Sequence, residues 1–312
     1  MPDLLQIGGI TDAMRDRLTP HFTIHKLGDG DYPADAITHI ATNGHDGVPA
    51  DIMAACTNLK MVSGYGVGYD AVDTDAAVAR NVIVTHTPDV LNAEVASTAV
   101  MLMLTSFRNF LADEAHARSG AWERDGNAPL SRSADNRRVG ILGLGRIGQA
   151  IADKLAPFNP DIHYHTRSQK DVPYTYHDTL KGMAETVEVI ICITPGGPST
   201  NKIVNAEVME ALGPDGTLIN VSRGSVVDEE AMVAALQSGK LGYAALDVFE
   251  AEPKIPDALK TMSNVVLLPH VGSGTHETRA AMGDLVVDNL IDHLKTGKVR
   301  TPVPECAHLN PA

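Results

Sequence analysis

Cysteine is scarce in this sequence. The only three cysteines, Cys56, Cys192 and Cys306, lie far apart along the chain. An odd number of distant thiols forms neither a disulfide framework nor the close pairs that mark a zinc or redox site. We therefore expect buried or incidental thiols, and we expect no metal site.

Positive charge and long apolar runs are also lacking. The chain has 25 lysines and arginines against 39 aspartates and glutamates, which gives a formal net charge of −14. Nucleic-acid backbones are bound through clustered basic side chains, so nucleic acid is not expected as a partner. No apolar run approaches the roughly 20 residues of a membrane span. Residues 1–10 contain no basic segment ahead of an apolar stretch, so we expect a cytoplasmic protein with no membrane partner.

The apolar sequence that is present suffices for two domains. Of 312 residues 44% are hydrophobic, and this length exceeds the usual size of a single core. Short apolar runs alternate with helical stretches in two successive series, and each series predicts a parallel sheet. The expected strands are 4–7, 37–41, 61–63 and 82–85 in the first series, and 139–142, 162–166, 189–193, 217–221, 243–246 and 265–268 in the second.

Helices are expected as well. Residues 93–117 suit one long, mostly buried helix, whose apolar set includes Phe110 and Leu111. A second helical pattern covers 228–237. The last helix, 275–296, has no strand after it, so we expect it to return and pack on the first domain.

Residues 119–138 belong to neither series. They are polar and interrupted by Gly, Pro and Asn apart from Trp122 and Leu130, which is typical of a long surface connection. Trp122 could line a cleft or lie in a subunit contact. A lone tryptophan is more often a buried anchor, and we predict that role.

A glycine-rich segment follows the strand at 139–142. Residues 143–148 read Gly-Leu-Gly-Arg-Ile-Gly and precede a helical stretch. In this setting the first glycine makes the tight turn, the second lets a pyrophosphate approach the main chain, and the third lets the helix pack on the strand. The segment predicts a dinucleotide site that includes Gly143, Gly145, Arg146, Ile147 and Gly148.

The end of the next strand indicates which dinucleotide binds. About 20 residues after its glycines an NAD site usually carries Asp or Glu for the ribose 2′-hydroxyl. This chain has Thr166, Arg167 and Ser168 there, with no carboxylate. A guanidinium and two hydroxyls suit a 2′-phosphate, so we expect NADP(H) to be preferred, with NAD(H) as the alternative.

Two histidines on the same strand require comment. His163 and His165 alternate and therefore face one side of the strand. A histidine pair could bind a metal, but no nearby carboxylate or thiolate completes a ligand set, so we treat both as structural.

Later segments hold the residue types that ketoacid reduction requires. Arg223 follows the strand 217–221, and a guanidinium can bind a carboxylate through two hydrogen bonds and polarise the adjacent carbonyl. Hydride addition to a ketone leaves an alkoxide, so the site needs a proton donor, for which His270 is the natural candidate. Glu252 could hydrogen-bond the far ring nitrogen and fix the tautomer. Taken singly, each residue also fits an ordinary structural role.

Together these segments resemble the D-isomer-specific 2-hydroxyacid dehydrogenase family, and within it the glyoxylate/hydroxypyruvate reductases that use NADPH. The resemblance extends over nearly the whole chain, from 64–70 to 285–290. Its motifs are Gly-Leu-Gly-Arg-Ile-Gly at 143–148, Asn-Val-Ser-Arg-Gly at 220–224, Leu-Asp-Val-Phe-Glu-Ala-Glu-Pro at 246–253 and Pro-His-Val-Gly-Ser at 269–273.

The resemblance implies an α/β fold with two doubly wound parallel-sheet domains. A Rossmann dinucleotide-binding domain, 98–279, would be inserted in a flavodoxin-like substrate domain, 1–97 and 280–312. The substrate domain would therefore be built from both ends of the chain.

The resemblance also implies roles for individual residues. Arg223 would orient the ketoacid, Glu252 would support His270, and His270 would donate the proton. Asp247 would meet the nicotinamide carboxamide. Further cofactor contacts are expected at Thr98, Pro195 and Gly272.

The substrate carboxylate would be held by the backbone at Val67 and Gly68. Tyr65, beside them, would narrow the pocket or stack on the substrate, although it could instead pack next to the glycine-rich loop.

The implied function is NADPH-dependent reduction of a small 2-ketoacid, glyoxylate or hydroxypyruvate, to the D-2-hydroxyacid by a homodimer. One alternative is a 2-ketogluconate or aromatic ketoacid reductase. Another is a nucleotide-sensing binding protein that has kept the fold but lost turnover. The complete set of Arg223, Glu252 and His270 favours an enzyme, because a sensor has no chemical need for a proton donor.

Overall fold

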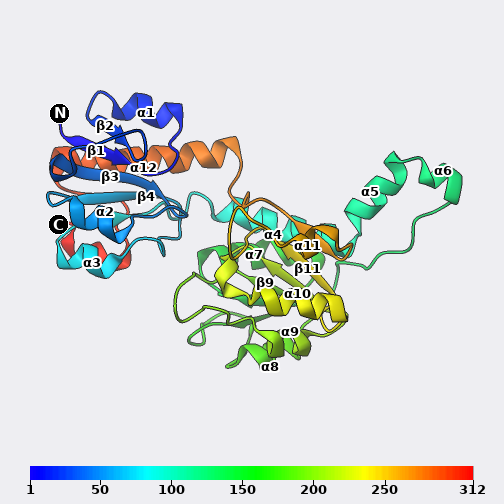
Figure 1. Ribbon diagram of the computed structural model, residues 1–312. Helices are drawn as coiled ribbons and strands as arrows, with labels where there is room; N and C mark the ends of the chain where they lie inside the picture. Colours follow the sequence, from blue (N-terminus) through cyan, green and yellow to red (C-terminus); the bar gives the residue numbers. More distant parts are fainter. Residues whose placement is uncertain (312) are drawn as a thin grey trace. The chain divides into compact units, whose positions relative to one another are not determined.

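The computed structural model describes residues 1–311 and shows two compact units (Figure 1). Unit 1 comprises Met1–Leu91 and Thr275–Ala312, and unit 2 comprises Asn92–Gly274. One unit is thus built from both ends of the chain and the other from its middle. The sequence placed the first boundary at residue 97, inside helix α4 (Asn92–Phe107), whereas the whole of α4 lies in unit 2.

Unit 1 contains a five-stranded sheet in the order β2-β1-β3-β4-β5, with every neighbouring pair parallel. This is the flavodoxin-like order, which confirms the fold expected for the substrate domain. The strands are β1 (Asp3–Gln6), β2 (Thr23–Lys26), β3 (Ile37–Asn43), β4 (Met61–Tyr65) and β5 (Ile83–Thr85).

Helices cover the sheet of unit 1. The long helix α12 (His276–Thr296) packs against β4 and α1, which confirms that the last helix returns to the first domain. It begins where the Thr275 side chain accepts a hydrogen bond from Thr278 N and ends at Gly297, whose φ of 73° suits glycine. The remaining helices are α1 (Asp12–Leu18), α2 (Ala50–Ala55) and α3 (Thr74–Ala79), with 3₁₀ helices η1 (Ala34–Ala36) and η4 (Pro304–Leu309).

Unit 2 contains a seven-stranded sheet in the order β12-β11-β10-β9-β6-β7-β8, again parallel throughout. The order reverses between β6 and β9, as in a Rossmann fold, which confirms the second expected domain. The strands are β6 (Arg138–Leu142), β7 (Asp161–His165), β8 (Thr175–Tyr176), β9 (Val189–Cys192), β10 (Thr217–Asn220), β11 (Tyr243–Leu246) and β12 (Val265–Leu267).

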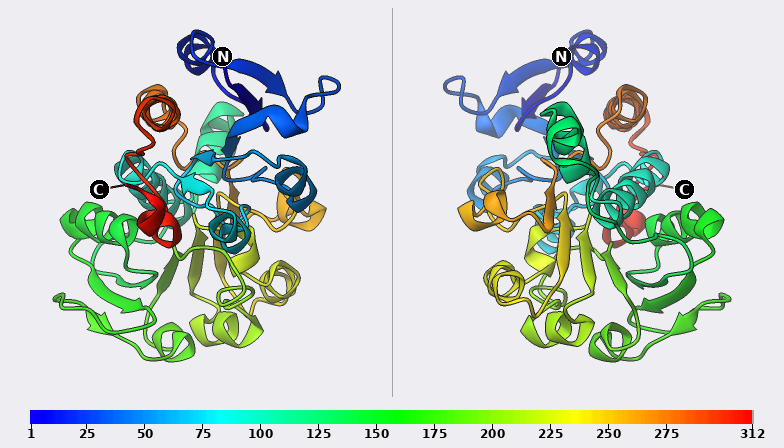
Figure 2. Two further views of the ribbon diagram at one scale, coloured as in Figure 1. Left: turned by 90° about the vertical axis from the view of Figure 1, so that its left-hand side faces the viewer. Right: turned by 90° about the vertical axis from the view of Figure 1, so that its right-hand side faces the viewer.

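Both faces of this sheet carry helices, and Figure 2 shows α7 and α10 on opposite sides. Helix α7 packs against α4, while α9 packs against both α8 and α10. The helices of unit 2 besides α4 are α5 (Phe110–Arg118), α6 (Ala121–Asp125), α7 (Arg146–Leu155), α8 (Leu180–Ala184), α9 (Ala206–Leu212), α10 (Glu229–Ser238) and α11 (Asp257–Thr261), with η2 (Ala156–Phe158) and η3 (Gly224–Val226).

The single long helix expected over 93–117 is wrong. The chain breaks at Asn109, which adopts a left-handed conformation with φ of 49°, and α5 starts in a new direction, bent by 62° from α4. Helix α5 has no buried residue, and Phe110 and Leu111 are 58% and 55% exposed. The regular spacing of apolar residues, from which burial was predicted, therefore continues beyond the end of the buried helix α4.

The buried anchor expected at Trp122 is also wrong. Trp122 is 62% exposed, and its indole N–H donates to Asn127 Oδ1 over 3.0 Å. Residues 119–138 do form a surface segment, as expected, but it includes the short helix α6. Figure 1 shows α5 and α6 extending away from the sheet of unit 2, so we call residues 108–131 the arm.

Strands β2 and β8 were not expected. Each lies at the edge of its sheet, and their residues are half-buried or exposed, so neither shows the continuous apolar run of a central strand. The three cysteines are all buried and free, as expected. Among residues 1–311 no single helix is long and apolar enough to cross a membrane, and only the bent pair α4 and α5 passes such a test jointly.

Candidate active site

The predicted functional residues of unit 2 lie where its parallel strands end. The glycine loop follows β6, Thr166–Ser168 follows β7, and Pro195 follows β9. Because carboxyl ends of parallel strands meet at one edge, and ligands of such sheets bind beside the point of strand reversal, this edge is the candidate site. The other residues at this edge are Arg223 after β10, Asp247 after β11, and His270 and Gly272 after β12.

Two glycines of the loop after β6 are required by the fold. Gly143 has a φ of 100°, and a Cβ on it would lie 2.8 Å from Thr194 N. A Cβ on Gly148 would lie 2.3 Å from Gly143 O, so this glycine permits the close approach of α7 to the strand end. Both positions match the roles expected for the first and third glycines of the motif.

The middle glycine differs from the other two. A Cβ on Gly145 would have no neighbour within 4 Å, so the protein itself does not require glycine there. Gly145 is the residue that precedes α7, at the helix end where main-chain N–H groups and the helix dipole favour an anion. Open space in front of such a helix end fits a pyrophosphate, and the loop therefore fits a dinucleotide.

The loop after β7 is tied to the glycine loop. Gly143 N donates to His165 O over 3.0 Å, which sets the two strand ends side by side. Thr166 turns its hydroxyl inward and donates to Ser168 O over 2.7 Å. Arg167 and Ser168 are exposed, so a guanidinium and a hydroxyl are available to a phosphate at this position.

Thr98, Pro195 and Gly272 also lie beside the site. Thr98 of α4 donates its hydroxyl to Gly272 O over 3.2 Å, so two predicted cofactor residues from distant parts of the sequence are in contact. Pro195 O accepts from the Thr200 hydroxyl over 2.7 Å, which closes the loop after β9.

The segment that carries Arg223 is held by a residue whose role the sequence did not reveal. Asn220 is 1% exposed, donates through Nδ2 to Arg223 O over 2.9 Å, and accepts from the Ser222 amide and hydroxyl. A buried amide at the end of a strand is the signal that could have identified it. Arg223 is half-buried and donates through Nη1 to Ser222 O over 2.9 Å.

Gly224 brings two strand ends together. A Cβ there would lie 1.9 Å from the Phe249 carbonyl carbon and 2.3 Å from Glu250 N. Only glycine allows the chain after β10 to run so close to the chain after β11. The motif Asn-Val-Ser-Arg-Gly therefore needs its glycine for packing, and the arginine before it is placed by that packing.

Asp247 fastens the segment that contains His270. It is 1% exposed, and its two carboxylate oxygens accept from Val271 N over 2.7 Å and from Gly272 N over 2.8 Å. Its carbonyl accepts from His270 N over 2.8 Å. Burial raises the pKa of the Asp247 carboxyl above its usual value, and the two N–H donors act against that rise.

His270 and Glu252 form a direct pair. The imidazole Nδ1 donates to Glu252 Oε2 over 2.7 Å, while Glu252 Oε1 accepts from Phe249 N over 2.9 Å. The Glu252 side chain is 17% exposed and that of His270 43% exposed. His270 has a φ of 54°, a left-handed conformation that is uncommon outside glycine and concentrates at functional sites.

This pair leaves one ring nitrogen for chemistry. With Nδ1 bonded to a fixed carboxylate, the tautomer and ring orientation are set, and Nε2 is the nitrogen that can give or take a proton. The structure therefore brings together Glu252 and His270 as the sequence predicted, and it places Arg223 on a neighbouring strand end. The set suits general acid–base chemistry on a substrate with a carboxylate.

The predicted substrate residues Tyr65, Val67 and Gly68 belong to unit 1. Tyr65 is the last residue of β4, and Val67 and Gly68 lie in the loop that follows it. Two carbonyls of this loop accept hydrogen bonds: His86 Nδ1 donates to Val67 O over 2.9 Å, and Thr87 N donates to Gly66 O over 2.8 Å. This loop offers main-chain groups and no charged side chain before Asp70.

The Tyr65 side chain contacts Arg279, which also belongs to unit 1. Its hydroxyl donates to Arg279 O over 2.8 Å, and the Arg279 guanidinium lies 5.6 Å from the ring centre. Burial raises the pKa of the Tyr65 phenol. These contacts agree with the packing role that the sequence left open.

His163 and His165 both contact His177. His163 Nδ1 and His177 Nε2 lie 2.8 Å apart, and His165 Nδ1 donates to His177 O over 2.9 Å. Within residues 1–311, no group of three or more His, Cys, Asp or Glu side chains is arranged to hold a metal ion.

Comparison with known proteins places these features in a family. Residues 100–272 match the family described as D-isomer specific 2-hydroxyacid dehydrogenase, NAD binding domain. The chain is 44% identical over 271 residues to a hydroxyphenylpyruvate reductase of Plectranthus scutellarioides, covering 86% of both proteins. It is 39% identical over 306 residues to a 2-ketogluconate reductase of Gluconobacter oxydans, covering 97% of this chain and 98% of that protein.

A solved structure agrees over nearly the full length. An NADPH-dependent glyoxylate/hydroxypyruvate reductase from Sinorhizobium meliloti, in complex with NADP and malonate, is 46% identical and superposes with a TM-score of 0.93, covering 98% of each chain. The family match, the long alignments and the two sheet orders lead to one conclusion: the chain belongs to the D-isomer specific 2-hydroxyacid dehydrogenase family.

Proposed function

We propose that this protein reduces a small 2-ketoacid, glyoxylate or hydroxypyruvate, to the D-2-hydroxyacid, with NADPH as the preferred cofactor. The observation that carries the proposal is the 2.7 Å bond between His270 and Glu252 at the sheet edge that also holds Arg223 and the glycine loop. A bound reduced nicotinamide supplies the hydride.

The protein's own residues then have distinct tasks. Arg223 binds the ketoacid carboxylate and polarises the carbonyl, which stabilises the negative charge that develops on its oxygen. His270 gives its proton to that oxygen, and Glu252 holds the ring while the charge on the imidazole changes. Backbone groups at Val67 and Gly68 hold the carboxylate.

The preference for NADPH rests on the loop after β7. Arg167 is exposed in a loop that has no carboxylate to bind a ribose 2′-hydroxyl, and a guanidinium complements a 2′-phosphate. Gly143, Gly145 and Gly148 hold the pyrophosphate, and Asp247 meets the nicotinamide carboxamide. The Sinorhizobium meliloti relative was solved with NADP, which supports the same preference here.

The size of the substrate separates the proposal from its alternatives. Relatives include a 2-ketogluconate reductase and a hydroxyphenylpyruvate reductase, so a larger substrate is the second candidate. The Sinorhizobium meliloti relative, 46% identical over 98% of the chain, is a glyoxylate/hydroxypyruvate reductase, which supports a small acid.

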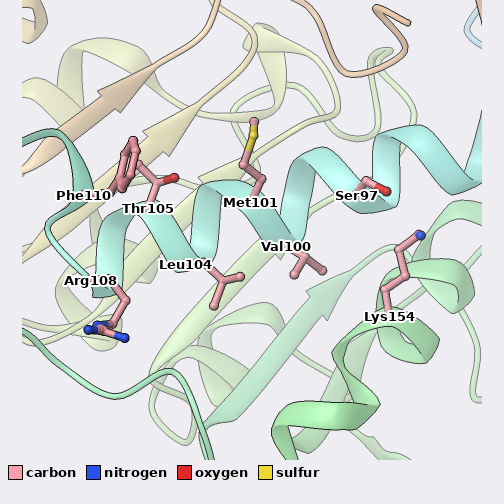
Figure 3. Close-up of a pocket in the computed structure, with 8 residues that line it drawn as sticks. All are labelled: Ser97, Val100, Met101, Leu104, Thr105, Arg108, Phe110 and Lys154. Atoms are coloured by element: carbon pink, nitrogen blue, oxygen red, sulfur yellow. The ribbon is translucent and has the colours of Figure 1, made fainter. Parts of the chain in front are cut away.

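The arm supports a homodimer. Five of the seven large hydrophobic side chains that are exposed among residues 1–311 lie between positions 101 and 130, and such a concentration is typical of an interaction surface. Two of them, Met101 and Phe110, line a groove of about 630 Å³ that runs along α4, to which α7 contributes Lys154 (Figure 3). We propose that a second copy of the chain covers this surface. The five side chains are Met101, Phe110, Leu111, Trp122 and Leu130.

The dimer is tested by the mass in solution. Light scattering coupled to gel filtration should give twice the chain mass, and the double variant Trp122→Ser, Leu130→Ser should shift the protein toward a monomer. If the double variant has the same mass in solution as wild type, the arm is not the contact between the two subunits. A cytoplasmic location stays a prediction.

Activity tests the rest of the proposal. Oxidation of NADPH and NADH is followed by absorbance with glyoxylate, hydroxypyruvate, 2-ketogluconate and phenylpyruvate. We expect the highest kcat/KM with a small ketoacid and NADPH, and loss of turnover in His270→Ala. A strong preference for phenylpyruvate would refute the small substrate, and cofactor binding without turnover of any ketoacid would favour a nucleotide sensor.

A further inference from the structure

The loop that follows β7 is closed by one buried hydroxyl. Tyr164, in the middle of β7, is 0% exposed. Its Oη accepts from Lys170 N over 2.8 Å and donates to Lys170 O over 3.2 Å. Both main-chain groups of Lys170 are thus bonded to a side chain of the strand that the loop has just left, and residues 165–169 form a closed turn between the two points.

The closed turn contains the residues expected at the 2′-phosphate. Thr166 and Ser168 are joined by the 2.7 Å bond within the turn, and Arg167 between them is exposed. The start of the turn is fixed as well, because Gly143 N donates to His165 O. The main chain on either side of Arg167 is therefore held by groups outside the turn.

A second tyrosine contacts the same turn more weakly. Tyr176 of β8 donates its hydroxyl to Thr166 O over 3.4 Å, and its ring lies 5.4 Å from that of Tyr164. This bond is near the limit for a hydrogen bond, whereas the 2.8 Å bond from Lys170 N to Tyr164 is of ordinary length. The turn thus depends mainly on Tyr164.

We propose that Tyr164 is a positioning residue for recognition of the 2′-phosphate. It does not touch the nucleotide. By bonding both main-chain groups of Lys170 it holds the turn in one shape, so that the main chain that carries Arg167 and Ser168 need not be ordered when NADPH binds. The inference deepens the proposed function and rests on its assignment of NADPH as cofactor.

The hydroxyl, rather than the ring, carries this role. Phenylalanine would fill the same buried space beside Tyr176, so packing alone does not require tyrosine. Removing the hydroxyl takes from the Lys170 amide its bond to Tyr164 and leaves the Lys170 carbonyl with the Val172 amide, which donates to it over 3.1 Å. Loss of a hydrogen bond of this kind changes an equilibrium by up to roughly tenfold. The effect should fall on ligands that carry a 2′-phosphate.

The experiment compares two nucleotides by calorimetry on the full chain. Wild type, Tyr164→Phe, Tyr176→Phe and Lys170→Ala are each titrated with 2′,5′-ADP and with ADP. In Tyr164→Phe we expect the Kd of 2′,5′-ADP to rise about tenfold and that of ADP less than about twofold. Tyr176→Phe should show a smaller rise, because its bond is longer. Lys170→Ala keeps both main-chain bonds and should bind both nucleotides almost as wild type does.

Steady-state kinetics provide a second readout. In Tyr164→Phe the KM for NADPH should rise, while kcat with NADPH and both constants with NADH stay close to wild type. Equal loss of both nucleotides would indicate general damage to the domain and overturn the inference. An unchanged 2′,5′-ADP affinity would also overturn it, as would a loss in Lys170→Ala as large as in Tyr164→Phe, which would assign the effect to the lysine ammonium.

Arg167→Ala separates this inference from the proposed function. If Arg167→Ala still distinguishes 2′,5′-ADP from ADP as wild type does, the assignment of NADPH to this loop fails, and the inference fails with it. If Arg167→Ala loses the distinction while Tyr164→Phe keeps it, only the positioning role fails.

Discussion

Each unit contains a histidine in a short hydrogen bond, but the two histidines have opposite surroundings. His39 of unit 1 is 3% exposed, and its Nε2 lies 3.0 Å from His293 Nδ1. His270 of unit 2 has 43% of its side chain exposed and bonds the Glu252 carboxylate over 2.7 Å. The first is enclosed with a second histidine, whereas the second faces a carboxylate and leaves its other ring nitrogen open to a ligand.

The surroundings also explain the titration of His39. Burial, as the largest cause, and charge repulsion by the neighbouring His293 and Lys60 together lower its pKa to about 3. Thr38 Oγ1, 2.8 Å from Nδ1, and the Phe22 ring complete its environment, and neither brings a negative charge. Within one chain the same side chain is thus a neutral core group in one sheet and the proposed proton donor in the other. Its place relative to a carboxylate and to solvent decides which.

The largest expected effect tests the catalytic member of this comparison. His270→Gln should lower kcat by about 10²–10⁴-fold, since a positioned proton donor contributes that much. Its affinity for NADPH, measured by fluorescence titration, and its free energy of unfolding should stay near those of wild type. His39→Phe is the matched control: if it loses kcat at neutral pH while folded, the two histidines do not differ as argued.

The next effect is on stability in acid. Because the pKa of His39 is about 3 in the folded state against 6.5 for a free histidine, the unfolded chain binds the extra proton between these values. The part of the free energy of unfolding that comes from burying neutral His39 has its full value above pH 6.5. It falls by about 1.4 kcal/mol per pH unit as the pH drops from 6.5 toward 3. The lowered pKa of His293 acts in the same direction.

Urea unfolding of wild type and His39→Phe measures this slope. The variant should lose less stability than wild type between about pH 6 and about pH 4. Parallel curves for the two proteins would show that His39 already titrates normally in the folded state.

A smaller effect distinguishes two glycines of unit 2. Gly148→Ala places a methyl group 2.3 Å from Gly143 O and should lower the free energy of unfolding by about 1–3 kcal/mol. Gly145→Ala meets open space and should leave stability unchanged while weakening NADPH binding, because the methyl group lies where the pyrophosphate approaches. Equal melting temperatures for the two variants would contradict the packing argument.

The smallest expected effect lies in unit 1. His86→Ala removes the donor to Val67 O and should raise the KM for the ketoacid about tenfold, with kcat within about threefold of wild type. His86→Asn, whose amide can also donate, should recover part of the loss. A fall in kcat with an unchanged KM would mean that unit 1 takes part in the chemical step, which would remove the contrast between the units.

Much of this layout was predictable from the sequence. Central strands such as 189–193 are continuous apolar runs because parallel sheets are covered on both faces, and the glycine loop has the spacing that a strand-to-helix turn demands. Glu252 and His270 could be paired because of the family resemblance, since 18 positions separate them in the chain. Spacing alone would not have joined them.

The remaining features depend on contacts that a linear pattern does not contain. The break between α4 and α5 depends on the left-handed conformation of Asn109, and the exposure of Trp122 depends on where the arm extends. Edge strands such as β2 are half-exposed and carry no strong period. The Tyr164 hydroxyl bonds a residue six positions away, and no pattern in the sequence predicts this contact.

The division of the chain into a continuous and a discontinuous unit has a consequence for its synthesis. Residues 92–274 leave the ribosome as one stretch, so unit 2 has its whole sequence available for folding while α12 is still being made. The sheet of unit 1 emerges first but must wait about 200 residues for the helix that packs on β4. During that delay Met61, which is fully buried in the finished protein, belongs to an apolar surface that is incompletely covered. It lies on the same face of β4 as Ser63, whose hydroxyl donates to Val286 O of α12. The sheet of unit 1, which is synthesised first, is therefore the part of the nascent chain where we expect aggregation and chaperone binding to be greatest.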